Sequence, residues 1–535
     1  MKRFIFFTIL VLSLGLLISA LNGSGDHFHY SQLNLPETEF ELIKNGRTGT
    51  DRDLLSDLTF NNYPSFVDKP SSRRFYSVDP DDPDTDPTVG FSSPEKNTRL
   101  AFSGEIIPGS YIPFIAYTDT EYKEYSLVVT NLPLIRIESA EEYLTGIVKE
   151  DIHEIRFTLY DNRSGTLYPY VQSDGTIHIR GNGSRFYEKK NFRLTLTERG
   201  TGKGIHEKQT PLLGLRPDGD WLLYAAYNDQ EKIRDVFSTN LWMESCGDDN
   251  SFGLRNGLEY RYTELFWNDR YCGLYALGYP IDAKQMGVQP NAAGHYDEFV
   301  FKQKHWGPKA EGYDPDYDGL ILQYDAYQSD HNNGIALTKM YFSMLEAGAS
   351  NGLWSNDANN AVDIWLYIKL IQGVDTVNTE GKMRNMFLTI KKSDSGRKFL
   401  YTPWDMDISW GNRINPYNNI TSPYALDADD NSCEMTVNPV SILKDKDPEV
   451  IGLIRERYRE LRADGWSEQK IDAMIDAYEQ DIFDSGAYIR DMERWPDGNY
   501  QDPETGLSLF REYVHARLRS MDNYIANLSL SEKDR

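Results

Sequence analysis

Hydrophobic and polar positions alternate with a period of two through the first half of the chain. Such alternation predicts strands that bury one face and expose the other. A further pair of apolar runs, separated by Asn268-Asp269, predicts a hairpin over residues 262–277. The three clearest single strands are expected at residues 154–160, 176–180 and 191–196.

Helical spacing of apolar residues dominates the second half of the chain. It is first seen over residues 232–245, and one hairpin, over residues 386–402, interrupts the later helices. A chain whose strands come first and whose helices mostly follow is typical of the α+β class. The later helices are expected at residues 335–345, 361–371, 449–461, 468–483 and 507–528.

The first 21 residues have the charge order of a secretory signal. Lys2 and Arg3 precede an uncharged apolar run from Phe4 to Leu21, and Ala20 supplies a small residue near its end. The run is just long enough to span a bilayer, so an uncleaved anchor is the alternative to a cleaved signal. Either way, an extracytoplasmic location is predicted, secreted or at the cell surface.

The next segment, residues 22–97, is polar and contains repeated Asp and Pro at residues 79–87. Proline blocks helices and strand ladders while the carboxylates repel one another, which predicts a solvated linker. A calcium loop at residues 79–87 is the alternative. Short apolar runs separated by Gly and Pro then predict a small β unit over residues 98–131.

Composition excludes several classes of function. The chain has 535 residues, 56 basic and 82 acidic, which gives a formal net charge of −26. A nucleic-acid-binding surface needs clustered Lys and Arg, so nucleic acid is not an expected partner. Hydrophobic residues make up 40% of the chain, enough for a packed core, and three cysteines are too few for a disulfide scaffold.

Carboxylates gather around the second hairpin. Asp405 and Asp407 follow its last strand, and two oxygen donors at a strand end suit Mg²⁺ or Mn²⁺. Upstream, an apolar helix breaks at Gly373 and presents Asp375, and Asn385 begins the hairpin. Protein kinases present a base, a metal-binding Asn and a metal-binding Asp in this order. The HRD and DFG signatures of ordinary kinases are absent.

Basic side chains gather in a glycine-containing loop, residues 180–190, between two predicted strands. Its sequence, RGNGSRFYEKK, can bring backbone N–H groups and positive charge close to phosphates. Lys190 shares a face with Phe192, so Lys190 is expected to point inward and Lys189 to remain solvated. A hairpin with a basic edge is the alternative interpretation.

These segments together resemble the CotH kinase family, the spore coat protein H group of atypical protein kinases. The resemblance covers roughly residues 132–528. It rests mainly on RGNGSRFYEKKNFRL at residues 180–194, on ELFWNDRYCGLY at residues 264–275 and on PWDMD at residues 403–407. Further landmarks are Leu132 to Ile135, Asn228-Asp229, Ile233-Arg234, Asp375, Asn385 and the closing helix near residues 511–528.

The resemblance implies a two-lobed, protein-kinase-like fold with a β-rich N-lobe and a helical C-lobe, preceded by the small β unit. It implies ATP and Mg²⁺ or Mn²⁺ as cofactors and Ser or Thr of secreted or coat-type proteins as acceptors. The catalytic residue would be Asp375. The implied metal ligands are Asn385, Asp405 and Asp407, and the implied nucleotide-binding residues are Lys190, Arg180 and Arg185.

Two departures from the family pattern affect these assignments. Asp375 stands ten residues before Asn385 rather than about five, so Glu380 is an alternative acid. The strand ending Gly273-Leu274-Tyr275 lacks the Glu that commonly follows it. The alternative function is therefore a CotH-like structural or assembly protein of the cell surface or spore coat. For a kinase, the acidic body predicts a basic, Ser-rich protein substrate, with membrane contact only through an N-terminal anchor.

Overall fold

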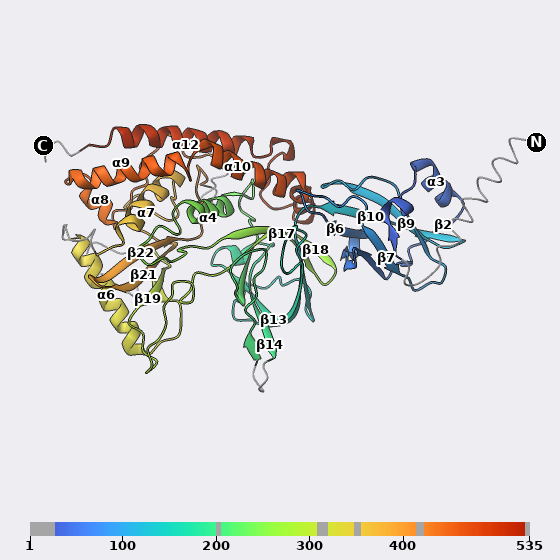
Figure 1. Ribbon diagram of the computed structural model, residues 1–535, viewed down its shortest axis with the longest axis horizontal. Helices are drawn as coiled ribbons and strands as arrows, with labels where there is room; N and C mark the ends of the chain where they lie inside the picture. The colour runs from blue at the N-terminus through green and yellow to red at the C-terminus, as the bar shows by residue number, and fades with distance from the viewer. Residues whose placement is uncertain (1–26, 200–204, 308–318, 347–354, 414–421, 530–535) are drawn as a thin grey trace, which may run out of the picture. The chain divides into compact units, whose positions relative to one another are not determined.

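The computed structural model describes residues 27–199, 205–307, 319–346, 355–413 and 422–529 (Figure 1). The predicted signal or anchor at residues 1–21 lies outside these residues. Within them, no helix is both long and apolar enough to cross a bilayer. The extracytoplasmic location of the chain stays a prediction.

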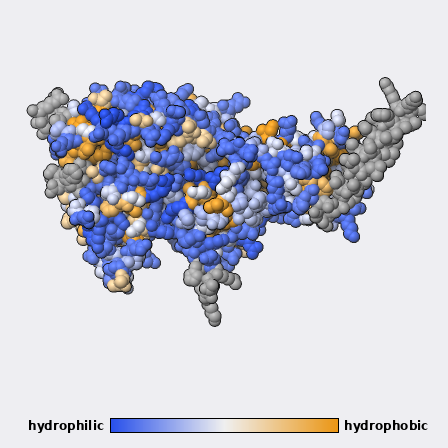
Figure 2. Space-filling view, in the orientation of Figure 1, coloured by the Kyte–Doolittle hydropathy of each residue, from blue (hydrophilic) through white to orange (hydrophobic). Residues whose placement is uncertain are grey.

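Contacts divide the chain into two compact units. Unit 1 consists of Met1–Gly219, Tyr262–Tyr275 and Gln480–Pro496. Unit 2 consists of Asp220–Arg261, Ala276–Glu479 and Asp497–Arg535. The face shown in Figure 2 is mainly hydrophilic in both, in line with the net charge of −26.

Unit 1 begins with two sheets that share one core. The first has the order β1-β7-β3-β4, and the second has the order β5-β6-β10-β9-β8, with β2 beside β10. Phe60 and Val89 of the first sheet and Phe114 and Leu127 of the second belong to one buried cluster. The elements are β1 (Phe28–His29), α2 (Tyr30–Leu33), α3 (Glu37–Asn45), β2 (Thr48–Gly49), β3 (Asp57–Phe60), β4 (Tyr63–Pro64), β5 (Phe66–Asp68), β6 (Arg73–Ser77), β7 (Thr88–Ser92), β8 (Arg99–Phe102), β9 (Tyr111–Tyr117) and β10 (Glu121–Thr130).

This arrangement differs from the linker predicted for residues 22–97. From residue 27 onward the segment is folded, because isolated aromatic residues such as Phe28, Phe60 and Tyr76 enter the shared core one at a time. Short apolar strands of this kind do not produce the long runs from which strands are predicted. Asp79 in the Asp/Pro stretch is buried and accepts the backbone N–H of Ser164 at 2.6 Å. The predicted β unit at residues 98–131 is thus part of a larger folded module.

The largest sheet carries the strands that the alternation predicts. Its order is β13-β12-β11-β17-β18-β16-β14-β15, and an additional pairing of β13 with β14 closes seven of these strands into a barrel. Period-two alternation predicts each strand but not this closure, which depends on pairing between distant segments. The strands are β11 (Leu134–Ser139), β12 (His153–Tyr160), β13 (Tyr170–Arg180), β14 (Asn191–Arg199), β15 (Ile205–Glu207), β16 (Asp220–Tyr224), β17 (Tyr260–Trp267) and β18 (Arg270–Gly278).

Unit 2 contains the hairpin that precedes Asp405. Its small sheet has the order β20-β19-β21-β22, and α7 packs against β22 as well as against α9 and α12. The long helix α12 packs against both α9 and α10 (Figure 1). The strands are β19 (Phe299–Gln303), β20 (Leu320–Leu322), β21 (Met386–Ser393) and β22 (Gly396–Pro403). The helices are α4 (Arg234–Ser245), α6 (Gln328–Glu346), α7 (Ala358–Ile371), α8 (Pro439–Leu443), α9 (Pro448–Ala463), α10 (Glu468–Glu479) and α12 (Ser508–Ala526), and α11 (Ala487–Arg494) belongs to unit 1.

Local sequence explains where these helices begin. The Asp357 side chain accepts the N–H of Asn360 at the start of α7, and that of Asp447 accepts the N–H of Glu449 at the start of α9. The helix α7 is buried along most of its length, which fixes the position of the loop that follows it. The predicted α+β class is confirmed. The two-lobed kinase-like arrangement stays a prediction.

Candidate functional site

The loop after α7 brings Asp375 and Asn385 into contact. The helix ends where Gln372 takes a left-handed backbone, with a φ of 53°. Asn385 Nδ2 donates a hydrogen bond to Asp375 Oδ2 at 2.9 Å. Arg384 forms an ion pair with the same carboxylate, and its Nε donates to the Asp375 carbonyl at 3.0 Å. The acid and the amide that the sequence pairs are therefore neighbours.

The ten-residue interval between them folds into a small turn. Val377 forms a β-bridge with Met383, and the Asn378 N–H donates to the Lys382 carbonyl at 3.0 Å. Glu380 lies near the tip of this turn, exposed and paired with Lys382. Because the extra residues loop outward, the longer interval does not separate Asp375 from Asn385. Glu380, the alternative acid, does not share these contacts.

Asp405 lies two residues after the end of β22, with Trp404 between them. Its φ of 64° lies in the left-handed region, as does the φ of 50° at Asn385. Trp404 connects the two, because its N–H donates to the Asn385 carbonyl at 3.1 Å. Left-handed backbone is uncommon outside glycine, although Asn and Asp tolerate it, and it gathers at functional sites. Both carboxylates lie beyond Pro403, the last residue of β22, and Asp405 is exposed while Asp407 is half-buried.

Four carboxylates interact electrostatically around Asp407. Burial raises the pKa of Asp407 well above its ordinary value, and the charges of Asp405, Asp235 and Asp229 raise it further. Arg384 opposes this negative charge: burial lowers the pKa of its guanidinium, while Asp405 and Asp407 raise it. Asp407 thus lies among other carboxylates, with Arg384 as a cation that interacts with it.

Two of these acids come from α4 and the turn before it. Asp235 Oδ1 accepts the N–H of Met406 at 2.7 Å, which connects α4 to the segment after β22. Asp229 accepts from the buried Arg234 guanidinium at 2.6 Å. Sequence reasoning missed Asp235 and took Asp229 only as a family landmark. The available signal was the position of both acids at the start of a predicted helix, where carboxylates are also common as caps.

The predicted metal ligands have the right donor chemistry for a hard divalent cation. Carboxylate and amide oxygens suit Mg²⁺ or Mn²⁺, and a cation would offset the repulsion around Asp407. Among the described residues, no three His, Cys, Asp or Glu side chains form a metal-holding group by themselves. An ion held by Asn385, Asp405 and Asp407 would therefore need further oxygen ligands, which phosphates can supply.

Lys189 and Lys190 of unit 1 are both buried, which corrects the expectation that Lys189 is solvated. The strand β14 begins only at Asn191, so its alternation does not extend back to the lysines. Lys189 Nζ lies 2.7 Å from Asp491 Oδ1, and both side chains are fully buried. Asp491 lies on α11 and also accepts the Leu274 N–H at 2.9 Å. The sequence does not predict Asp491 as the partner of Lys189.

The Asp491 carboxylate lies close to the backbone of Gly273, the glycine of the Gly273-Leu274-Tyr275 segment. Gly273 has a φ of 106°, and a Cβ there would lie 2.1 Å from Asp491 Oδ1. Only glycine fits this close approach. The buried pair of Lys189 and Asp491 gives the lysine an acidic partner although the strand lacks the usual Glu.

The other basic residues of the loop have different surroundings. Lys190 Nζ donates to the Arg185 carbonyl at 2.7 Å, and burial lowers the pKa of the Lys190 ammonium. Arg180 and Arg185 are half-buried, and the Arg185 guanidinium lies over the Phe186 ring at 5.0 Å. Lys190, Arg180 and Arg185 belong to unit 1, whereas Asp375, Asn385, Asp405 and Asp407 belong to unit 2. Their joint action on one nucleotide stays a prediction.

Comparison with known proteins gives one family. Residues 177–521 match the family model described as CotH kinase protein. The match includes all seven residues that the sequence assigns to catalysis, metal or nucleotide, and it begins after the N-terminal module. A search of curated proteins finds no match.

Proposed function

The chain belongs to the CotH kinase family, and we propose that it is an active protein kinase that transfers the γ-phosphoryl group of ATP to Ser or Thr. Family membership alone supports a CotH-like kinase and, in general terms, the use of ATP and a divalent metal. The specificity for hydroxyl side chains, the acceptor and the site residues belong to the proposal.

One observation carries the proposal: Asn385 donates to Asp375 at 2.9 Å although ten residues separate them. A base and a metal-binding amide must be close together to serve one phosphoryl transfer. In a protein that used neither the Asp375 carboxylate nor the Asn385 amide, nothing would favour keeping the two side chains in contact across an interval longer than the family's.

The roles follow from the chemistry of each side chain. Asp375 accepts the proton of the acceptor hydroxyl, while Arg384 and Asn385 hold the carboxylate in place. Asn385, Asp405 and Asp407 hold the cation. Lys190, with Arg180 and Arg185, meets the nucleotide phosphates. Bound ATP and Mg²⁺ or Mn²⁺ supply the phosphoryl group and neutralise the charge that develops during its transfer.

The acceptor is proposed to be a secreted or surface protein with basic, Ser-rich segments. A body with a net charge of −26 attracts basic peptides and repels acidic ones. A peptide with Lys or Arg around its serine should therefore be phosphorylated faster than one with Asp or Glu.

The test is transfer of label from γ-labelled ATP to such a peptide, with Mg²⁺ and Mn²⁺ in parallel. Asp375→Asn should lower the rate by about 10²- to 10⁴-fold, the usual contribution of a general base. Glu380→Gln is the matched control from the same loop, because Glu380 is exposed and its carboxylate pairs with Lys382 at the tip.

Two results would reject the proposal. One is absence of transfer by the unaltered chain with either metal, together with nucleotide binding that Asp405→Asn leaves unchanged. The other is an equal loss of activity in Asp375→Asn and Glu380→Gln. The first result would favour the alternative, a CotH-like structural or assembly protein without phosphoryl transfer.

A further inference from the structure

A cavity lies in unit 1, in a part of the chain that the family match mostly leaves out. It has a volume of about 450 Å³ and is lined by residues of β5, β6, β10 and β11 and of the segment 53–58. Asp269 is the one lining residue within the matched range 177–521. The proposed kinase site uses none of these residues.

Arg74 is a buried cation in the wall of this cavity. It is 7% exposed, and its Nη2 donates to the Leu55 carbonyl at 3.3 Å. No ion pair within 4.0 Å joins it to a carboxylate of the described residues, although Asp53, Asp57 and Asp269 influence it from farther away. Burial lowers the pKa of this guanidinium. Burying a charge without an opposite charge is costly, so an anion bound beside Arg74 would stabilise this arrangement.

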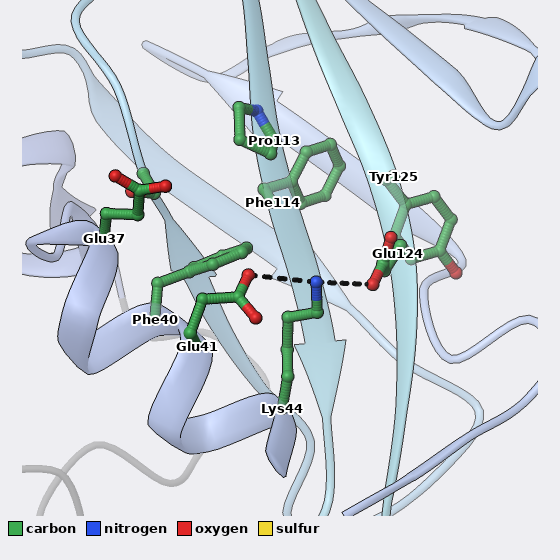
Figure 3. A pocket seen from close by; sticks show the side chains of 9 residues that line it. Glu37, Phe40, Glu41, Lys44, Pro113, Phe114, Glu124 and Tyr125 are labelled. Carbon is green, nitrogen blue, oxygen red and sulfur yellow. Dashed lines mark hydrogen bonds and ion pairs between the residues drawn. The ribbon is translucent and has the colours of Figure 1, made fainter.

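Other cations of unit 1 show what Arg74 lacks. The fully buried Arg490 holds Glu264 with two hydrogen bonds, at 2.8 and 3.0 Å. In a neighbouring pocket of the same module, Lys44 lies between Glu41 and Glu124, at 3.1 and 2.7 Å (Figure 3). These cations have carboxylates of the protein within ion-pair distance, and Arg74 has none among the residues described.

Two further donors with no partner line the same cavity. Ser65 is 6% exposed, and its Oγ has no hydrogen-bond partner in the part of the chain that the structure describes. Arg136 Nε is likewise buried without an acceptor. The Ser65 hydroxyl and the Arg136 Nε, which lack acceptors among the described residues, and the Arg74 guanidinium, which has no carboxylate partner among them, suit an anion with several oxygen atoms.

The acids that line the cavity have partners of their own. Asp53 pairs with Lys123 at 3.1 Å. Asp269 pairs with Lys69 at 2.8 Å and lies 3.8 Å from Arg136. Asp57 accepts from the Ser92 hydroxyl at 2.7 Å. Glu138 lies 3.8 Å from Arg136. The lining holds five basic and four acidic residues, so it is slightly positive in a chain of net charge −26.

We propose that this cavity binds a phosphoryl group, with Arg74 as its main ligand and Ser65 and Arg136 as further donors. A tetrahedral phosphoryl group offers oxygens in several directions, and Arg binds it with two parallel hydrogen bonds. The volume of about 450 Å³ exceeds that of phosphate alone and leaves room for the group that carries it. The source is either a phosphorylated Ser or Thr side chain or free phosphate. This inference does not depend on the proposed kinase activity.

The test measures binding to the full chain, without nucleotide, by titration calorimetry. The probes are inorganic phosphate, a phosphoserine peptide, its unphosphorylated form and acetate. We expect saturable binding of both phosphate probes and none of the unphosphorylated peptide or acetate. Tighter binding of the phosphopeptide identifies a protein-borne group as the source, and equal binding identifies free phosphate.

Variants tie the binding to the cavity. Arg74→Met should weaken phosphate binding by about tenfold or more, the usual effect of losing a charged hydrogen bond. Ser65→Ala should weaken it by about fivefold without disturbing the fold, because the hydroxyl has no partner to lose. Lys44→Met removes one positive charge from the neighbouring pocket and should leave binding unchanged.

Three results would overturn the inference. They are absence of saturable phosphate binding, equal binding of acetate, and an equal loss in Lys44→Met and Arg74→Met. If Arg74→Met does not fold, unchanged binding in Ser65→Ala and Arg136→Met decides against the cavity. None of these results depends on whether the chain transfers phosphate from ATP.

Discussion

Asp375 and Asn385 of unit 2 are ten residues apart, and their side chains form a hydrogen bond. Lys189 and Lys190 of unit 1 are adjacent, but the Lys189 ammonium pairs with a buried carboxylate and the Leu274 carbonyl, whereas that of Lys190 donates to the Arg185 carbonyl. Separation along the chain is therefore a poor guide to shared function. In both places the local hydrogen bonds decide which side chains act together.

The largest expected effect is a difference in the free energy of unfolding between variants of the two lysines. Lys189→Met leaves Asp491 charged and buried without its partner, which should cost about 3–5 kcal/mol in the free energy of unfolding. Lys190→Met breaks one hydrogen bond to a carbonyl and should cost about 1 kcal/mol. Urea unfolding of the two variants measures the difference.

The same pair of variants tests their roles in nucleotide binding. Lys190→Met should raise the KM for ATP while the protein stays folded, as expected for a residue that meets the phosphates. If Lys190→Met leaves the KM unchanged and a folded Lys189→Met raises it, the nucleotide lysine has been assigned to the wrong neighbour.

A smaller effect should come from metal at the acidic cluster. A ligand that binds only the folded state stabilises it by about 2.7 kcal/mol at 100 times its dissociation constant. Mg²⁺ or Mn²⁺ should therefore raise the unfolding free energy of the chain. Asp405→Asn should remove the gain, and Glu380→Gln should keep it. Equal gains in both variants would place the ion elsewhere.

The smallest effect should follow from shortening the loop after Asp375. Because Val377 pairs with Met383, residues 378–382 can be replaced by Asn-Gly without moving Asp375 or Asn385. The rate of transfer should stay within about threefold, since loop length changes closure entropy only slowly. A loss as large as that of Asp375→Asn would show that the turn itself takes part in the reaction.

Much of the site could be predicted because its parts lie at the ends of regular elements. The hairpin of β21 and β22 is confirmed, and it delivers Asn385 and Asp405 at its two ends. The burial of Phe192, Leu194 and Leu196 follows from the alternation along β14. These features depend on local sequence, which a single chain displays directly.

The parts that could not be predicted depend on distant contacts. Asp491, on α11, meets Lys189, and nothing near either residue indicates the other. The pairing of β13 with β14 closes the barrel, and the core of the N-terminal module combines isolated aromatic residues from two sheets. Asp235 was missed because an acid in the first turn of a helix is ordinary for that position.

The central claim is that Asp375 and Asn385 act as one unit in phosphoryl transfer. A double-mutant cycle of Asp375→Asn and Asn385→Ala, measured by label transfer from γ-labelled ATP, tests it most directly. The account predicts transfer by the unaltered chain and a double variant no slower than the slower single variant. Losses that multiply, or no transfer by the unaltered chain, would contradict it.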